Sequence, residues 1–373
     1  MKILVTGAKG FVGKNLCINL KNRGYTEVYE YDLDTPYENL EKWTKDCDFV
    51  FNLAGVNRPQ NKEEFMQGNC YFADKLLSLL AFHGNKCPIM LSSSIQATLD
   101  NDYGKSKKAG EDLLFEYGKI NGVKVLVYRF YNLFGKWCRP NYNSVIATFC
   151  NNIANGLPIQ VNDESVMLSL CYIDDVVDEL ISALEGNATP TDDGFYTVKT
   201  IYKKSLGEIA KLICSFRDSR ENKSVIDTLD EFTVKLYATY LSYLPKDKFS
   251  YPLDMKCDAR GSFTEIIRTS ERGQFSVNVA KPGIVKGNHW HNTKNEKFLV
   301  VSGKGVIRFK SPFDDQVIEY FVSGEKLEVV DIPTGYTHNI ENIGDTDLVT
   351  FMWASECFNP DKPDTFFLPI DKK

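Results

Sequence analysis

Three of the four histidines in the 373-residue chain lie in its last quarter. His289 and His291 stand one residue apart in "GNHWH", and His338 follows in "PTGYTHNIEN". On a β-strand, side chains two residues apart point to the same face, so the first two should converge. Together with Glu296, three neutral imidazoles and one carboxylate predict a site for a borderline divalent ion. Zn, Fe, Mn and Ni all suit these donors, and we expect Zn²⁺ because no redox co-substrate is implied.

A second group of side chains is suited to proton transfer. Tyr103 and Lys107 in "YGKSK" are four residues apart, so on a helix they share one face. A nearby ammonium lowers the pKa of a tyrosine and can also hold a ribose hydroxyl. The run Ser92–Ser94 ends the apolar segment "CPIMLSSS", and a hydroxyl there can donate to a substrate carbonyl. These residues predict acid/base chemistry on a ketone or alcohol.

The N-terminal residues have the pattern of a dinucleotide site. The apolar run "KILVT" is typical of a buried strand, and Gly7, Gly10 and Gly13 follow it before an amphipathic helical stretch. Such glycines allow backbone amides to approach a pyrophosphate at the helix N-terminus. Asp32 ends the next predicted strand, where an acid binds the ribose hydroxyls.

Two domains are expected from the change of pattern along the chain. Strand and helix alternate up to about residue 243, which predicts a doubly wound parallel sheet of the Rossmann type. After about residue 250, short alternating strands separated by glycines predict an all-β barrel or jelly roll. We therefore assign residues 1–243 to a nucleotide-binding domain and residues 244–373 to a β-barrel domain.

Composition excludes several classes of partner. The net charge of −6 leaves no basic excess to neutralise phosphates, so no nucleic-acid partner is expected. No apolar run approaches the length of about 20 residues that spans a bilayer, so no membrane insertion is expected. No export leader precedes "MKILVTG", and none of the ten cysteines forms a CxxC pair. A cytoplasmic location with reduced thiols is the expectation.

The N-terminal domain resembles the extended short-chain dehydrogenase/reductases that act on nucleotide sugars. The segments that carry this resemblance, in order, are "NLAG", "SSS", "YGKSK", "RFYNLFG" and "YIDDVVD". The resemblance implies that Tyr103 is the acid/base, that Lys107 is its electrostatic partner and a cofactor ligand, and that Ser94 is the third member. Ser93 is a close competitor for that third role. Ala54 of "NLAG" would lie against the cofactor.

The same resemblance implies a substrate site and a nicotinamide cofactor. Asn132, Arg139 and Asn143 would contact the sugar nucleotide. Asp32 and Asp34 would repel a 2′-phosphate, which favours NADH or tolerance of both cofactors, whereas reductases of this kind often use NADPH.

The C-terminal domain is similar to two families. "GNHWHNTKNEKFLVVSG" and "PTGYTHNIEN" resemble the two cupin motifs, which implies a metal-binding jelly-roll barrel. "DARGSFTE" resembles the substrate-binding strands of deoxysugar 3,5-epimerases, which implies substrate contacts for Arg260, Phe263 and Lys286. The general base of those epimerases corresponds to His289, which the metal site also claims, so Lys286 and Lys297 remain candidate bases.

The whole chain resembles the bifunctional capsular polysaccharide synthesis enzymes of the UDP-N-acetyl-L-fucosamine route. The segments include "LAGVNRP", "SSSIQAT", "TYLSYLP" and "KGNHWHNTKNEKFLVVSGKGVIRF". The resemblance implies C3 epimerisation of a UDP-2-acetamido-2,6-dideoxy-hexos-4-ulose, then C4 reduction to UDP-2-acetamido-2,6-dideoxy-L-talose, by a homodimer. Two alternatives stay open: a single-function reductase whose cupin is a binding or dimerisation module, and an iron oxygenase in the cupin domain.

Overall fold

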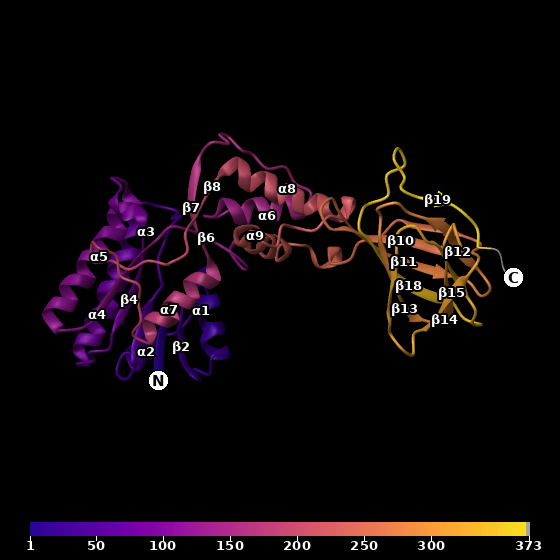
Figure 1. Cartoon of the computed structure of the whole chain (residues 1–373). Coiled ribbons are helices and arrows are strands. Elements are labelled where there is room, and N and C mark those ends of the chain that lie inside the picture. Colours follow the sequence, from indigo (N-terminus) through magenta and orange to yellow (C-terminus); the bar gives the residue numbers. More distant parts are fainter. Residues whose placement is uncertain (371–373) are drawn as a thin grey trace. The chain divides into compact units, whose positions relative to one another are not determined.

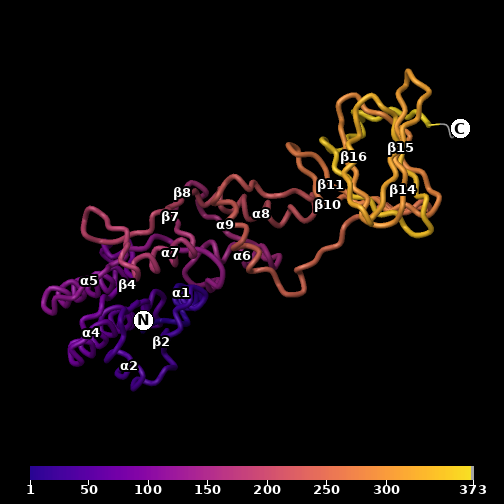
Figure 2. The backbone as a smooth tube through the Cα atoms, turned by 60° about the horizontal axis from the view of Figure 1, so that its bottom comes forward, coloured from indigo at the N-terminus to yellow at the C-terminus, as the bar shows by residue number. Residues whose placement is uncertain are grey.

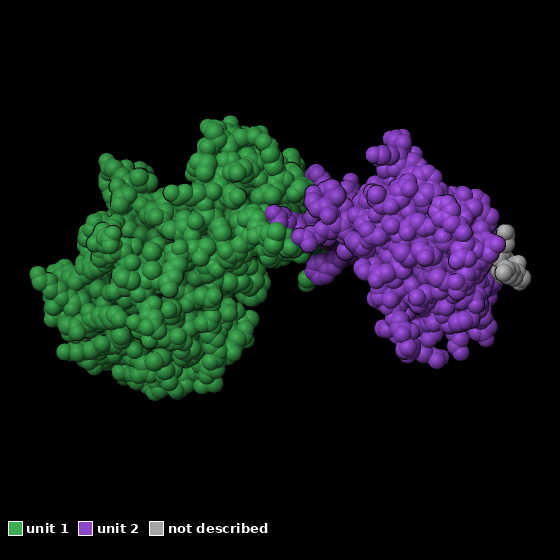
Figure 3. All heavy atoms as spheres, in the orientation of Figure 1, with its two compact units in different colours: residues 1–216, 228–246 green, residues 217–227, 247–373 purple. Residues whose placement is uncertain are grey.

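The computed structural model describes residues 1–370 and contains two compact units (Figure 3). The N-terminal unit consists of residues 1–216 and 228–246, and the C-terminal unit consists of residues 217–227 and those from 247 onward. The units therefore differ from a single boundary between residues 243 and 244 in two places, the segment 217–227 and residues 244–246. The domain assignment made from the sequence stays a prediction.

The N-terminal unit is built on a five-stranded sheet whose neighbouring strands are all parallel. The order is β2-β1-β3-β4-β5, with β1 (Lys2–Thr6), β2 (Glu27–Tyr31), β3 (Phe49–Asn52), β4 (Ile89–Ser94) and β5 (Val125–Phe130). Figure 1 shows α1 (Phe11–Asn22) and α7 (Ile173–Leu184) on one side of it, and α4 (Phe72–Phe82) and α5 (Asp102–Asn121) on the other. This arrangement confirms the predicted doubly wound parallel sheet.

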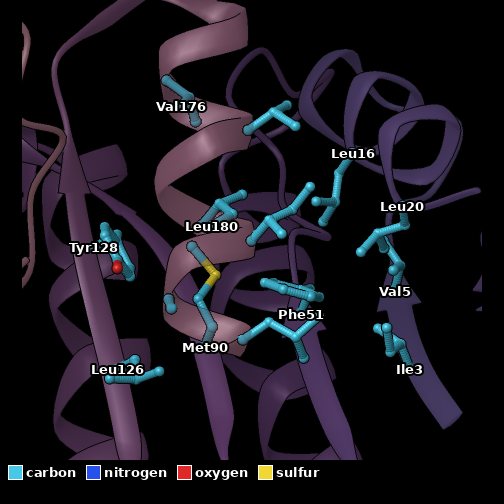
Figure 4. Packing of buried hydrophobic residues seen from close by; sticks show 14 of the residues in the cluster. Ile3, Val5, Leu16, Leu20, Phe51, Met90, Leu126, Tyr128, Val176 and Leu180 are labelled. Atoms are coloured by element: carbon cyan, nitrogen blue, oxygen red, sulfur yellow. The ribbon is translucent and has the colours of Figure 1, made fainter. Parts of the chain in front are cut away.

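Alternate residues of the strands enter two separate cores, as expected for strands buried on both faces. Ile3 and Val5 of β1 pack with Leu16 of α1 and Leu180 of α7 (Figure 4). Leu4, between them in the sequence, belongs to the opposite core, with residues of α4 and α5. Helices thus cover both faces of the sheet. The candidate site lies at its remaining open edge, where the strands have their carboxyl ends.

A smaller sheet and further helices complete this unit. The sheet has the order β6-β7-β8, with β6 (Asn132–Phe134), β7 (Met167–Tyr172) and β8 (Tyr202–Ser205). The other helices of this unit are α2 (Tyr37–Trp43), α3 (Glu63–Met66), η1 (Gln67–Tyr71), η2 (Ile95–Thr98), α6 (Val145–Ala154) and α9 (Glu231–Leu241). Both α8 (Leu206–Asn222) and η3 (Lys246–Lys248) begin in the N-terminal unit and end in the C-terminal unit.

Two antiparallel sheets form the C-terminal unit, and their strands surround a shared core (Figure 2). The first has the order β16-β13-β18-β11-β10-β9, and the second has the order β15-β14-β17-β12-β19. Phe298 and Val300 of the first sheet pack with Ile307 and Ile340 of the second. This confirms the predicted all-β jelly-roll architecture. The strands are β9 (Met255–Asp258), β10 (Gly261–Thr269), β11 (Gly273–Ala280), β12 (Val285–Trp290), β13 (Glu296–Ser302), β14 (Lys304–Lys310), β15 (Val317–Ser323), β16 (Val329–Ile332), β17 (Thr337–Asn342), β18 (Leu348–Ala354) and β19 (Phe366–Phe367).

Within residues 1–370, none of the helices combines the length and the apolar character required to cross a membrane.

Candidate active site and candidate metal centre

The glycine turn between β1 and α1 brings backbone into close contact where side chains would not fit. A Cβ on Gly13 would lie 2.2 Å from the carbonyl oxygen of Gly7, and a Cβ on Gly7 would lie 2.8 Å from the amide nitrogen of Ala54. Gly7 also has a φ of +66°. Gly10 is the N-cap of α1 and provides no side chain to accept from the first amides of the helix. These amides can bind the pyrophosphate of a dinucleotide.

Asp32 lies over this turn, and a lysine lies beside it. The carboxylate of Asp32 accepts a hydrogen bond from the backbone amide of Lys9 at 2.7 Å. The Lys9 ammonium pairs with the carboxylate of Asp34. Sequence reasoning looked for a cation only near the end of the second strand and so missed Lys9, which comes from the glycine turn.

The three residues predicted to act on the ketone lie together at the carboxyl edge of the sheet. Tyr103 is in the first turn of α5, whose N-cap Asn101 accepts from the amide of Gly104 at 2.8 Å. Ser94 ends β4, its hydroxyl accepts from the amide of Gln96 at 3.2 Å, and its side chain lies near enough to Tyr103 to lower the pKa of that phenol. The Lys107 ammonium donates to the carbonyl of Ser92 at 3.0 Å and lies 5.9 Å from the centre of the Tyr103 ring.

Burial sets the protonation of this group. Burial raises the pKa of Tyr103, and the nearby hydroxyl of Ser94 opposes this rise. Burial lowers the pKa of Lys107 to about 8, with the nearby Glu111 opposing. Tyr103 is therefore a neutral phenol that can donate a proton, and Lys107 is mostly a cation at pH 7.

Ser93 has a different environment from Ser94. Its hydroxyl donates to the buried carboxylate of Glu111 at 2.6 Å. Arg129 donates to the same carboxylate through Nε at 2.9 Å and Nη2 at 2.6 Å, and its guanidinium stacks on Phe195. This geometry favours Ser94 over Ser93 as the hydroxyl that acts with Tyr103.

Asn69 of η1 is a supporting residue that the sequence reasoning missed. Its buried side chain donates to the carbonyl of Val56 at 2.8 Å and to the hydroxyl of Ser106 at 3.0 Å, and accepts from the amide of Val56 at 3.0 Å. It thereby ties the loop after β3 to α5. A Cβ on Gly55 in that loop would lie 3.0 Å from the Lys107 ammonium. No sequence pattern points to Asn69.

The residues expected to contact the sugar nucleotide are exposed. Asn132 lies on β6 and donates to the carbonyl of Ser169 at 3.3 Å. Arg139 and Asn143 are in the loop before α6, where the Arg139 guanidinium lies 5.2 Å from the centre of the Tyr142 ring. Their side chains are accessible to a ligand.

The four predicted metal ligands converge inside the barrel. His289 lies on β12, His291 directly follows that strand, His338 lies on β17, and Glu296 begins β13 of the other sheet. His289 is the direct cross-strand partner of His338. One ligand atom from each of the four residues lies within 4.8 Å of all the others.

A β-bulge aims His289 of β12. The register between β12 and β17 shifts between Gly287 and His289. Gly287 has a φ of +107° and Asn288 a φ of +61°, and a Cβ on Gly287 would lie 2.8 Å from the carbonyl oxygen of His338. Bulges commonly re-aim side chains next to functional sites. Here the bulge places His289 opposite His338.

The electrostatics of this cluster suit a divalent cation. Burial, together with His338 and His291, lowers the pKa of His289 to about 4, so this imidazole is neutral at pH 7. Burial alone would raise the pKa of Glu296, but the contacts with His291 and His338 outweigh it and lower that pKa.

Four buried atoms in the cluster lack hydrogen-bond partners; one is Nδ1 of His338, and the other three face one another. Oε2 of Glu296 lies 3.5 Å from Nε2 of His291 and 3.3 Å from Nε2 of His338, and none of the three has a hydrogen bond. Ligand bonds of about 2.0–2.2 Å around a tetrahedral ion put neighbouring ligand atoms roughly 3.4 Å apart. Because unpaired buried polar atoms are costly, the residues fit a bound ion better than a bare cluster.

The lysines of the barrel differ in their contacts. Lys294, 13% exposed, lies 3.2 Å from Oε1 of Glu296, which leaves Oε2 for an ion. Lys297 pairs with Asp331 on the surface. The Lys286 ammonium has three acceptors, which are the carbonyls of residues 262 and 279 and the side chain of Asn278. Neither Lys286 nor Lys297 has a free amine aimed at the cluster in this geometry.

The remaining two predicted substrate contacts lie near the start of β10. Arg260 is in the turn between β9 and β10 and forms two hydrogen bonds to the exposed carboxylate of Asp258, at 3.0 and 2.6 Å. Phe263 is on β10, opposite Asn278 of β11.

Comparison with family models identifies the class of protein. The model described as the NAD dependent epimerase/dehydratase family matches residues 3–196, and the model described as the polysaccharide biosynthesis C-terminal domain matches residues 256–366. The chain belongs to the NAD dependent epimerase/dehydratase family.

Two relatives match nearly the whole chain, and a third matches part of it. UDP-2-acetamido-2,6-beta-L-arabino-hexul-4-ose reductase of Pseudomonas aeruginosa is 43% identical over 366 residues, which are 98% of this chain and 98% of that protein. The crystal structure of the capsular polysaccharide assembling protein CapF from Staphylococcus aureus has a TM-score of 0.92 and 55% identity, covering 99% of this chain and 100% of that one. The spore coat polysaccharide biosynthesis protein SpsL of Bacillus subtilis is 27% identical over 124 residues, which are 31% of this chain and 82% of that protein. These matches confirm the resemblance to capsular polysaccharide synthesis enzymes.

Proposed function

We propose that this protein is a bifunctional nucleotide-sugar enzyme. Its C-terminal unit epimerises a UDP-2-acetamido-2,6-dideoxy-hexos-4-ulose at C3, and its N-terminal unit then reduces the C4 ketone with NAD(P)H. The product is UDP-2-acetamido-2,6-dideoxy-L-talose, for surface polysaccharide synthesis. The observation that carries the reduction is the grouping of Ser94, Tyr103 and Lys107 in a chain 43% identical to a hexul-4-ose reductase along 98% of its length. We further propose that it acts as a cytoplasmic homodimer.

The reduction requires one hydride and one proton. A bound reduced nicotinamide would supply the hydride for C4 of the sugar. The phenol of Tyr103 gives its proton to the ketone oxygen, which becomes the C4 hydroxyl. Ser94 orients that oxygen through its hydroxyl. Lys107 stabilises the tyrosinate that remains and holds the ribose of the cofactor.

The cofactor site combines both signs of charge. Asp32 is placed to accept from the ribose hydroxyls of NADH, whereas Lys9 provides a cation for the 2′-phosphate of NADPH. Asp34 competes with that phosphate for Lys9. We propose that the enzyme accepts both cofactors and that Lys9 carries the preference for NADPH.

The epimerisation uses the acidity of the hydrogen at C3, which is adjacent to the C4 ketone. His289, His291, Glu296 and His338 would hold a Zn²⁺ ion. A bound divalent ion polarises a ketone oxygen and so stabilises negative charge on it. Around that centre, Lys294 fixes one oxygen of Glu296, and the barrel wall keeps the cluster away from solvent. Removal and return of the C3 proton then inverts the centre.

Product analysis by NMR tests both activities in the intact protein. The 4-keto sugar nucleotide is incubated in D₂O with and without NADH or NADPH. Without cofactor we expect deuterium at C3 of the sugar, and with cofactor we expect a C4 alcohol with inverted C3. A 4-keto sugar that stays unchanged under both conditions would overturn the proposal.

The same experiment separates the alternatives. Reduction at C4 without deuterium at C3 would favour a single-function reductase with the barrel as a binding or dimerisation module. For an iron oxygenase, elemental analysis would find iron, and oxygen uptake would accompany turnover.

A further inference from the structure

The C-terminal tail, residues 359–370, is attached to the loop that carries His291. The carboxylate of Asp364 accepts hydrogen bonds from three successive backbone amides of this loop: Asn292 at 2.9 Å, Thr293 at 2.7 Å and Lys294 at 2.9 Å. It also accepts from the hydroxyl of Thr293 at 3.2 Å. One side chain thus holds three of the five residues that connect β12 to β13, and both of those strands supply ligands to the cluster.

Asp364 also contacts the imidazole of His291. Nδ1 of His291 is hydrogen-bonded to the backbone carbonyl of Asp364. A carbonyl oxygen only accepts, so Nδ1 must carry the proton, and the lone pair then lies on Nε2. Nε2 is the atom that faces Glu296 inside the cluster. The tail therefore selects the tautomer in which His291 can bind an ion.

The rest of the tail is anchored independently of Asp364. β19 pairs with β12, where Phe366 is opposite Trp290, and these two rings stack at 4.7 Å. The amide of Leu368 donates to the carbonyl of Asn288 at 2.9 Å. Loss of the Asp364 carboxylate should therefore leave the tail in place and release only the loop.

We propose that Asp364 is a positioning residue of the metal centre, acting through His291 and the loop 292–294. The proposal rests on the proposed metal site, although Asp364 itself touches no other member of the cluster. Its carboxylate fixes the loop backbone, and its carbonyl fixes the His291 tautomer. Residues outside the ligand shell that orient a ligating histidine typically contribute about 10- to 100-fold to metal affinity.

The test uses the full-length protein and three variants. Asp364→Ala removes the carboxylate, Asp364→Asn keeps one acceptor oxygen, and Asp361→Ala is a matched control because Asp361 is an exposed acid of the same tail. Zn²⁺ affinity is measured by competition with a chromophoric chelator. The tautomer of His291 is read from two-bond ¹H–¹⁵N correlations of the imidazole, in the metal-free and the Zn²⁺-loaded protein. The melting temperature of the metal-free protein reports on folding.

Asp364→Ala keeps the main-chain carbonyl but releases the loop 292–294, so the His291 ring, which precedes that loop, is no longer held against the carbonyl. We therefore expect this variant to weaken Zn²⁺ binding at least tenfold and to give His291 a mixture of tautomers in the metal-free protein. Asp364→Asn should recover part of both losses, and Asp361→Ala should match the wild type. Wild-type affinity and a single Nδ1–H tautomer in Asp364→Ala would overturn the role of Asp364 alone. A wild-type protein that binds no Zn²⁺ would overturn the metal site and this role together. A lower melting temperature with an unchanged tautomer would mean that Asp364 serves only folding.

Discussion

Lys9 and Asp34 form an ion pair next to Asp32, so a cation and two acids share the place where a dinucleotide cofactor presents its adenosine ribose. The cation comes from the glycine turn, and both acids follow β2. The preference between NADH and NADPH should therefore depend on the balance of charge among these few side chains.

Substitution of Lys9 should change the preference between the two cofactors. A hydrogen bond to a charged group contributes about 1.5 kcal/mol or more, so Lys9→Ala should lower kcat/KM for NADPH about tenfold and leave that for NADH nearly unchanged. Asp34→Ala, which frees Lys9, should shift the preference towards NADPH. Lys14→Ala, an exposed lysine of α1, is the control. Equal losses for both cofactors in Lys9→Ala would contradict this assignment.

The low pKa of Lys107 predicts a basic limb in the pH profile of the reduction. Burial lowers this pKa from 10.5 to about 8, so the ammonium is lost as the pH rises through 8. Because the proposed role needs the cation, kcat/KM for the sugar should fall above pH 8. In Lys107→Arg the charge persists, so the limb should move to higher pH even if the rate is lower. A limb that stays near pH 8 in this variant would assign it to another group.

The same shift has a consequence for stability. Between about pH 8 and 10.5 the unfolded chain binds more protons at Lys107 than the folded chain, so this residue makes unfolding less favourable as the pH rises. Lys107→Met should remove that part of the pH dependence, as measured by denaturant unfolding at pH 7 and pH 10.

Tyr103→Phe should separate the two proposed activities. Loss of a general acid typically lowers a rate about 10²- to 10⁴-fold, so oxidation of NAD(P)H by the keto sugar should nearly stop. Exchange of the C3 hydrogen for deuterium should continue, because the histidine cluster is intact. Absorbance at 340 nm and NMR in D₂O give the two readouts, and loss of both activities would count against independent sites.

The two neighbouring serines provide a matched pair. Ser94→Ala should reduce kcat of the reduction about 10²-fold, because its hydroxyl acts on Tyr103 and the substrate. It should also cost about 1 kcal/mol of unfolding free energy, because the same hydroxyl accepts from the Gln96 amide at the start of η2. Ser93→Ala removes a donor to the buried carboxylate of Glu111, so it should cost about 1–3 kcal/mol of unfolding free energy and only a small part of the rate. Steady-state kinetics and urea unfolding distinguish these outcomes, and the reverse pattern would exchange the roles of the serines.

The fold and the grouping of the four candidate metal ligands were predicted from local patterns. A period of two residues places His289 and His291 on one face, and the apolar runs predict both kinds of sheet. The bulge at Gly287 and Asn288, which seats His289 opposite His338, depends on strand register and cannot be read from spacing. Spacing also does not show which serine faces Tyr103. Side chains alternate between the two faces of a strand, so Ser93 points away from Ser92 and Ser94, but the sequence does not say which of the two faces is buried.

Contacts between segments that are far apart in the chain could not be predicted from the sequence. Asp364 meets a loop 70 to 72 residues earlier, and the carboxyl group of an exposed tail has no distinguishing pattern. Asn69 is similar, since an amide in a helical stretch indicates neither burial nor partners until β3 and α5 are placed. Both bond largely to main-chain groups, which carry no sequence pattern, so the signal lies only in the three-dimensional arrangement.

Removal of His338 tests whether the cluster holds an ion that stabilises the barrel. The side chain is buried and supplies one of the four ligand atoms, so His338→Ala should lower the Zn²⁺ content of the purified protein. Ligation stabilises the folded state by about 2.7 kcal/mol when the free ion is at 100 times its Kd, so the wild type should melt at a lower temperature in EDTA. The variant should show little response to EDTA. His83→Ala, the fourth histidine and outside the cluster, should keep both the metal and the EDTA response. Metal content is measured by elemental mass spectrometry, and equal content in the two variants would remove His338 from the site. If the metal is lost but C3 exchange persists, the ion is structural. The base and acid of the epimerisation then lie elsewhere in the barrel.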